Sequence, residues 1–171
     1  MDSAARGAGS AATPSDGDPA RNSQSAAANS TTNRIKSLTL LQAAFSHNGF
    51  SRNENGFFRA VVDKKRVDGP ILITHTKNDK AVGVAYPLAS RLKGDKSAAL
   101  GDANDPFGGI GRNGAQKMDQ GEVIAGQLLA VNSAYTFQPR KFFNLEASSF
   151  IKGHSDVRGK EVAYALRRLI V

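Results

Sequence analysis

Cysteine is absent from this chain of 171 residues. Its absence excludes disulfide bonds, a thiol nucleophile, and zinc or iron–sulfur sites with cysteine ligands. Histidine is scarce, and His47, His75 and His154 are not spaced as paired zinc ligands on a helix would be. We therefore expect neither a metal site nor a cofactor.

Long hydrophobic runs are missing as well. No stretch approaches the ~18 apolar residues that a membrane span requires. The chain does not open with a basic segment followed by an apolar run, as a secretory signal peptide does. These features predict a cytoplasmic protein without a membrane partner, and the length fits one domain with a tail.

The N-terminal segment lacks the residues that build a core. Residues 1–33 contain no Val, Ile, Leu, Phe or Tyr and are rich in Ala and Ser. Such a segment has little apolar surface to bury and cannot offset the entropy lost on ordering. We predict a disordered tail over residues 1–33 and a folded domain over residues 34–171.

Within the folded part, apolar runs predict an α/β fold. Short runs without strict alternation, typical of strands covered on both faces, occupy residues 37–44, 70–76 and 141–145. Helical spacing predicts helices over residues 54–62, 84–92 and 157–171. The pattern of residues 122–130 fits either a helix or a strand. Residues 93–121 are rich in Gly and Asp, and we expect an irregular segment there. The order predicts about three parallel strands with helices between them.

The same patterns give the expected core. On the last helix the apolar face would consist of Val162, Leu166, Leu169 and Ile170, with Ser155 or Asp156 as the N-cap. Two aromatic pairs are also expected in the core, Phe57/Phe58 and Phe142/Phe143. Three strands leave much of a parallel sheet's edge unpaired. We therefore expect further strands from another chain or from a larger fold, or self-association through the open edge.

Two ionisable residues follow predicted strands. Asp79 comes three residues after Thr76, and His154 follows the third strand and its loop. Functional groups of open α/β sheets gather beyond the carboxyl ends of the strands. A carboxylate there could orient an imidazole that acts as a general base. The alternative is that Asp79 is a turn residue and His154 marks a helix start.

Three stretches carry a resemblance to a known family. Gly69-Pro-Ile-Leu-Ile-Thr-His-Thr-Lys-Asn-Asp79, Ala85-Tyr-Pro-Leu-Ala-Ser-Arg91 and Gly153-His-Ser-Asp156 resemble the C-terminal half of bacterial α/β-hydrolase-like proteins of poorly defined substrate. The segment from Gly101 to Gln116 resembles an insertion of that group. The resemblance, over roughly residues 35–171, implies part of a three-layer α/β-hydrolase-like sandwich. It also implies that Asp79 is the triad acid and His154 the triad base, in the usual order after a serine.

The nucleophile that the resemblance requires is missing. A Gly-x-Ser-x-Gly elbow should precede residue 37, where only the Ala- and Ser-rich segment stands. Ser46 follows a predicted strand, but it corresponds to the strand after the one that carries the family's serine. We therefore expect a truncated or inactive serine hydrolase, acting on an ester or amide only if a nucleophile were supplied. The alternative function is a noncatalytic basic α/β module that binds a protein or nucleic-acid partner.

Other signals are weaker. Gly109-Ile-Gly-Arg-Asn-Gly114 matches Gly-x-Gly-x-x-Gly, but it follows no predicted strand, so we predict a flexible loop rather than a nucleotide site. The basic clusters Lys64-Lys-Arg66 and Arg167-Arg168 belong to separate elements and form no known nucleic-acid motif. A solvated surface is the simpler interpretation, despite a net charge of +8. His75 lies inside a predicted strand and is expected to be structural.

Overall fold

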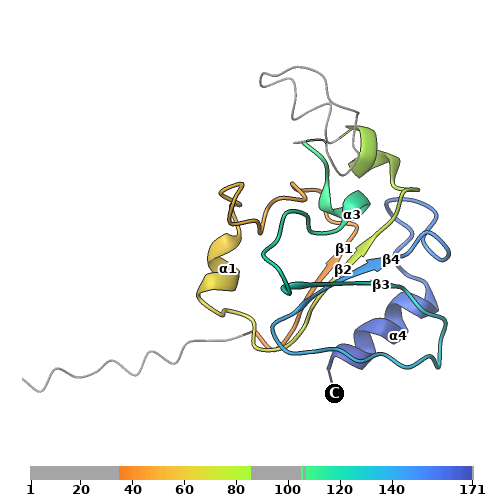
Figure 1. The fold of residues 1–171 in the computed structure, drawn as a ribbon. Coiled ribbons are helices and arrows are strands. Elements are labelled where there is room, and N and C mark those ends of the chain that lie inside the picture. Colours follow the sequence, from red (N-terminus) through yellow and green to blue (C-terminus); the bar gives the residue numbers. More distant parts are fainter. Residues whose placement is uncertain (1–34, 86–104, 106, 171) are drawn as a thin grey trace, which may run out of the picture. The chain divides into compact units, whose positions relative to one another are not determined.

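A computed structural model describes residues 35–85, 105 and 107–170 (Figure 1). Its elements, in chain order, are β1 (Leu38–Leu41), α1 (Arg59–Asp63), β2 (Ile71–His75), the π-helix η1 (Ala81–Ala85), α3 (Ile110–Asn113), β3 (Val123–Gln127), β4 (Phe142–Glu146) and α4 (Lys160–Leu169). The predicted tail and residues 86–92 of the predicted second helix lie outside the described residues. Among the described residues, no helix has the length and apolar character needed to cross a membrane.

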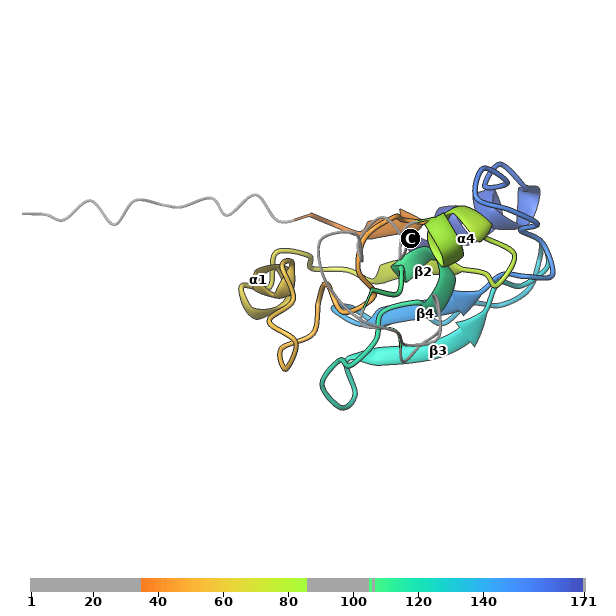
Figure 2. The same cartoon turned by 90° about the horizontal axis from the view of Figure 1, so that it is seen from above.

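The strands form one parallel sheet in the order β1-β2-β4-β3. Figure 2 shows β4 and β3 side by side. The α/β class is therefore confirmed, whereas the expected strand number is one too low. The ambiguous stretch 122–130 contains β3, which pairs with β4 from Val123↔Phe142 to Gln127↔Glu146. β4 pairs with the backbone groups on one edge of β3, and a local sequence pattern cannot reveal this partner.

The two central strands are buried on both faces, as their mostly apolar runs predict. Leu72, Phe143 and Leu145 pack on the same side of the sheet as the buried residues of α4. Ile71, Ile73 and Phe142 face the other side, where they pack with residues before α1 and in α3. The alternation of side chains along β2 and β4 therefore builds a core on each face of the sheet.

Helix α4 covers one face with a stripe of buried residues, Val162, Ala165 and Leu169. Leu166 is partly buried against the same core. The placement of Ile170 in this face is wrong, because the residue lies past the helix end and is 80% exposed. The predicted cap is also wrong: the N-cap is Gly159.

Helix α1 is shorter than predicted and begins only at Arg59. Phe57 precedes the helix and is 88% exposed, so its assignment to the core is wrong. Phe58 does pack inward, with its ring centroid 4.9 Å from that of Phe45 in an edge-to-face contact. Phe57 instead lies on the outer side of Phe58, with the two ring centroids 5.0 Å apart.

Candidate acid–base site

Asp79 lies in the loop between β2 and η1 and is completely buried. Its backbone N–H donates to the Thr76 carbonyl at 3.2 Å, which closes a turn directly after the strand. Its Oδ1 accepts a hydrogen bond of 2.9 Å from the Val82 N–H in the first turn of η1. The turn thus holds the carboxylate at the carboxyl end of the sheet, where the sequence predicts it.

His154 lies in the loop between β4 and α4, and its ring meets that carboxylate. The His154 Nδ1 atom is 2.8 Å from the Asp79 Oδ2 atom. The carboxylate is fully buried, whereas 43% of the His154 side chain is exposed. When the neutral ring carries its proton on Nδ1, its Nε2 has a free lone pair. The pair therefore has the geometry of an imidazole base oriented by a buried carboxylate.

Hydrogen bonds join the two loops that carry Asp79 and His154. The Asn78 amide donates to the carbonyls of Ser148 and Ile151 at 3.1 and 2.9 Å. The hydroxyls of Thr76 and Ser148 lie 2.8 Å apart. These contacts span the carboxyl ends of β2 and β4, which are neighbours in the sheet. They fix the separation of the loops, and with it the contact between Asp79 and His154.

A third side chain reaches the carboxylate from β1, and the sequence analysis missed it. With its amide oriented so that the nitrogen, not the oxygen, faces the surrounding acceptors, Gln42 donates to Asp79 Oδ2 at 3.1 Å and to the Gly111 carbonyl at 2.6 Å. Gln42 follows the last residue of β1 and is 1% exposed. The only signal in the sequence is a polar residue at the end of an apolar run.

The Gly-x-Gly-x-x-Gly segment supports this arrangement, and the prediction of a flexible loop there is wrong. Residues 110–113 form the short helix α3, with Ile110 and Gly111 buried. The Gly111 carbonyl accepts from the Thr76 N–H at 3.0 Å, and the Arg112 guanidinium donates to the Lys77 carbonyl at 2.6 Å. The glycine motif thus packs over the start of the Asp79 loop.

Ser46 lies elsewhere along the carboxyl edge. Its backbone forms an isolated antiparallel bridge with Gly109, and its Oγ accepts from the Asn48 N–H at 3.2 Å. Ser46 helps line a hollow of about 430 Å³ that is formed mainly by residues 45–58. Among the described residues that line this hollow, neither Asp79 nor His154 is included. No contact in the described part of the chain joins Ser46 to the His154 ring.

The other histidines have structural surroundings. Burial lowers the pKa of His75, and a hydrogen bond with the Arg112 backbone opposes that shift only in part. His47 is buried, and its Nδ1 lies 3.0 Å from the Asn113 amide. Within the described ranges, no group of three or more His, Asp or Glu side chains is arranged to hold a metal ion.

Comparison with known proteins gives no relative on which to base an assignment. No protein-family model, curated protein or solved structure matches the chain significantly. The site must therefore be interpreted from its own geometry.

Proposed function

We propose that the chain carries the acid and base of a serine-hydrolase-type triad, on a partial α/β-hydrolase-like sandwich. The observation that carries this proposal is the 2.8 Å contact between His154 Nδ1 and the buried Asp79 carboxylate. In this role Asp79 holds the ring and stabilises the imidazolium, while His154 takes the proton from an attacking hydroxyl. The reaction class is hydrolysis of an ester, thioester or amide.

The proposal includes the loss of activity in this chain. A triad needs a hydroxyl within hydrogen-bond reach of the base, about 2.6–3.2 Å, and donors for the oxyanion. The described residues place no serine hydroxyl in contact with the His154 ring. Ser46 helps line a hollow whose described lining does not include that ring. Acid and base alone give little catalysis, so we expect this chain by itself to be inactive.

The test is turnover of p-nitrophenyl acetate together with labelling by a fluorophosphonate. We expect the wild-type chain to hydrolyse the ester no faster than His154→Ala and to take up no stoichiometric label. Ser46→Ala is the matched control for labelling. A label on Ser46 that depends on both His154 and Asp79 would contradict the proposed inactivity and identify a complete hydrolase.

A noncatalytic module is the second candidate, and the position of β1 favours it. In the described sheet, β1 pairs only with β2, so one of its edges has no strand beside it. An uncovered edge offers backbone N–H and C=O groups to another strand. In this case the chain binds a second copy through β1, and the Asp79–His154 pair serves only to join two loops.

A further inference from the structure

We propose that Gln42 is a positioning residue for the Asp79–His154 pair: its amide fixes the carboxylate oxygen that accepts from the His154 ring. This inference rests on the proposed acid–base function. Gln42 follows β1, whereas Asp79 follows β2 and His154 follows β4. Gln42 would hold the Asp79 carboxylate from the segment after β1, whereas the sequence predicts a site formed only by the loops after β2 and β4.

The backbone at Gln42 has an unusual conformation. Its φ is 46°, in the left-handed region that residues other than glycine seldom adopt. The neighbouring Gly111 leaves room for this bend, since a Cβ built there would lie 2.5 Å from the Gln42 carbonyl carbon. Residues other than glycine persist in such a conformation where the surrounding structure holds them, and they cluster at functional sites.

Both the nitrogen and the oxygen of the Gln42 amide face polar partners. In the amide orientation that places its oxygen away from other acceptors, its nitrogen donates to Asp79 Oδ2 and to the Gly111 carbonyl. Its oxygen then faces the hydroxyl of Thr74, whose O–H can donate to it. The same hydroxyl oxygen accepts from the Gln42 backbone N–H at 3.4 Å. If the amide were rotated by 180°, its oxygen would face two other acceptors, Asp79 Oδ2 and the Gly111 carbonyl. The orientation of its N–H groups toward Asp79 is therefore fixed by the surrounding groups.

The consequence concerns the geometry of the carboxylate. Asp79 Oδ1 accepts from the Val82 N–H, while Oδ2 accepts from both Gln42 and His154. With the Val82 contact alone, the carboxylate could rotate and still keep one hydrogen bond. The Gln42 amide fixes Oδ2, so that its remaining lone pair faces His154 Nδ1. Hydrogen bonds to an ionised acceptor are stronger than neutral ones, which makes this restraint effective.

The experiment measures the tautomer of the His154 ring in the full chain by long-range ¹H–¹⁵N spectra, at a pH where free imidazole is neutral. Gln42→Met removes the amide but retains the volume. Gln42→Asn retains an amide but withdraws it by one methylene, and Asn tolerates the left-handed backbone well. Gln116→Met is the matched control, because its amide donates to the Asn113 carbonyl near the same α3 segment.

We expect mainly the Nδ1–H tautomer in the wild type and in Gln116→Met. In both Gln42 variants the ratio of the Nδ1–H to the Nε2–H form should fall about fivefold, the change in equilibrium that one ordinary hydrogen bond accounts for. If Gln42→Met does not fold, Gln42→Asn gives the result. An unchanged ratio in a folded Gln42 variant, even with a lowered unfolding temperature, would overturn the proposal, because it would show a purely structural role.

The tautomer of His154 in Asp79→Asn distinguishes a failure of the proposed acid–base function from a failure of the inference about Gln42. If Asp79→Asn leaves the ring in the wild-type tautomer, the carboxylate does not orient His154 at all. In that case the acid–base proposal fails together with the role of Gln42. If Asp79→Asn changes the tautomer and the Gln42 variants do not, only the inference about Gln42 is overturned.

Discussion

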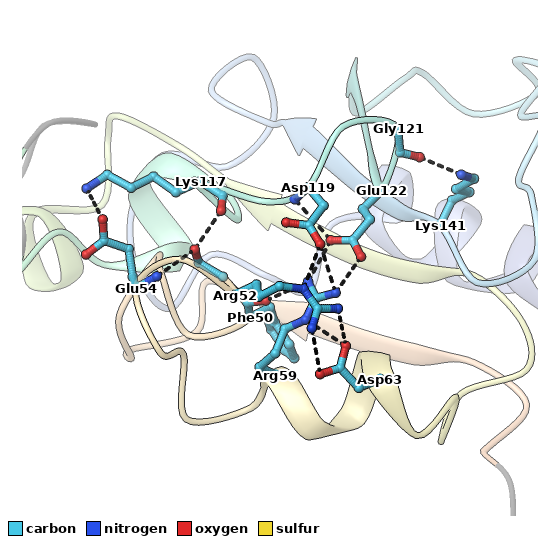
Figure 3. A network of polar contacts seen from close by, with 11 residues as sticks. Phe50, Arg52, Glu54, Arg59, Asp63, Lys117, Asp119, Gly121, Glu122 and Lys141 are labelled. Carbon is cyan, nitrogen blue, oxygen red and sulfur yellow. Dashed lines mark hydrogen bonds and ion pairs between the residues drawn. The ribbon is translucent and has the colours of Figure 1, made fainter.

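Arg59 and Glu122 form a bidentate ion pair. The Nη1 and Nη2 atoms of Arg59 each lie 2.8 Å from an oxygen of Glu122 (Figure 3). The same guanidinium donates to Asp63 at 3.0 Å and to Asp119 at 3.2 Å. The Arg59 side chain is only 10% exposed. These ion pairs connect the short helix α1 to the segment that precedes β3.

Glu122→Ala should therefore lower the free energy of unfolding by about 2 kcal/mol, because it leaves a largely buried guanidinium without its main partner. The control is Glu54→Ala, which breaks an ion pair with Lys117 whose side chains are 41% and 48% exposed. That change should cost less than about 0.5 kcal/mol. Urea unfolding at constant pH measures both values, and equal effects would show that the Arg59 network does not stabilise the fold.

The sequence predicted the central strands and the proximity of Asp79 and His154 for one reason. Leu72 and Phe143 belong to apolar runs that both faces of a sheet bury, and the carboxyl ends of such strands carry Asp79 and His154. The position of Gln42 beside Asp79 could not be found in this way, because Gln42 packs against Gly111, which is distant in sequence. Phe57 and Ile170 were misplaced because helical spacing does not show where a helix begins or ends.

Acidification should destabilise the fold through His75. Burial lowers its pKa in the folded state, so the unfolded chain takes up the proton first as the pH falls. Stability is therefore retained above the ordinary histidine value of about 6.5 and is lost as the pH drops below it. The slope of unfolding free energy against pH, measured between about pH 7.5 and 5.5, should be smaller in His75→Gln. Identical slopes would rule out a buried neutral His75.

Gly111→Ala should disturb both the fold and the site. The added Cβ would lie 2.5 Å from the Gln42 carbonyl carbon and 2.9 Å from the Ala43 nitrogen, and both are backbone atoms. We expect a loss of about 1–3 kcal/mol in the free energy of unfolding. Gly153→Ala, next to His154, is the control, since its Cβ would meet nothing within 4 Å. A Gly111 variant as stable as the control would contradict the close packing of α3 on β1.

Self-association through β1 is expected if this edge of the sheet is used; in the described sheet, β3 is the other edge strand. The Leu38 N–H donates to the Pro70 carbonyl at 3.2 Å, so the Thr39 N–H points away from β2. Thr39→Pro should weaken a dimer while leaving the β1–β2 pairing intact. Sedimentation velocity over a range of concentrations measures this effect, with circular dichroism as the check on folding. A wild-type chain that stays monomeric throughout would contradict association through this edge.

The hydrogen bond between Asp79 and His154 is tested most directly by the position of the imidazole proton. Selective ¹⁵N-histidine labelling and long-range spectra, with His154→Gln to assign the signals, show which ring nitrogen is protonated in the neutral form. A proton on Nδ1 in the wild type, shifted toward Nε2 in Asp79→Asn, is the predicted result. A wild-type ring protonated on Nε2 would contradict it, because the carboxylate would then receive no hydrogen bond from His154.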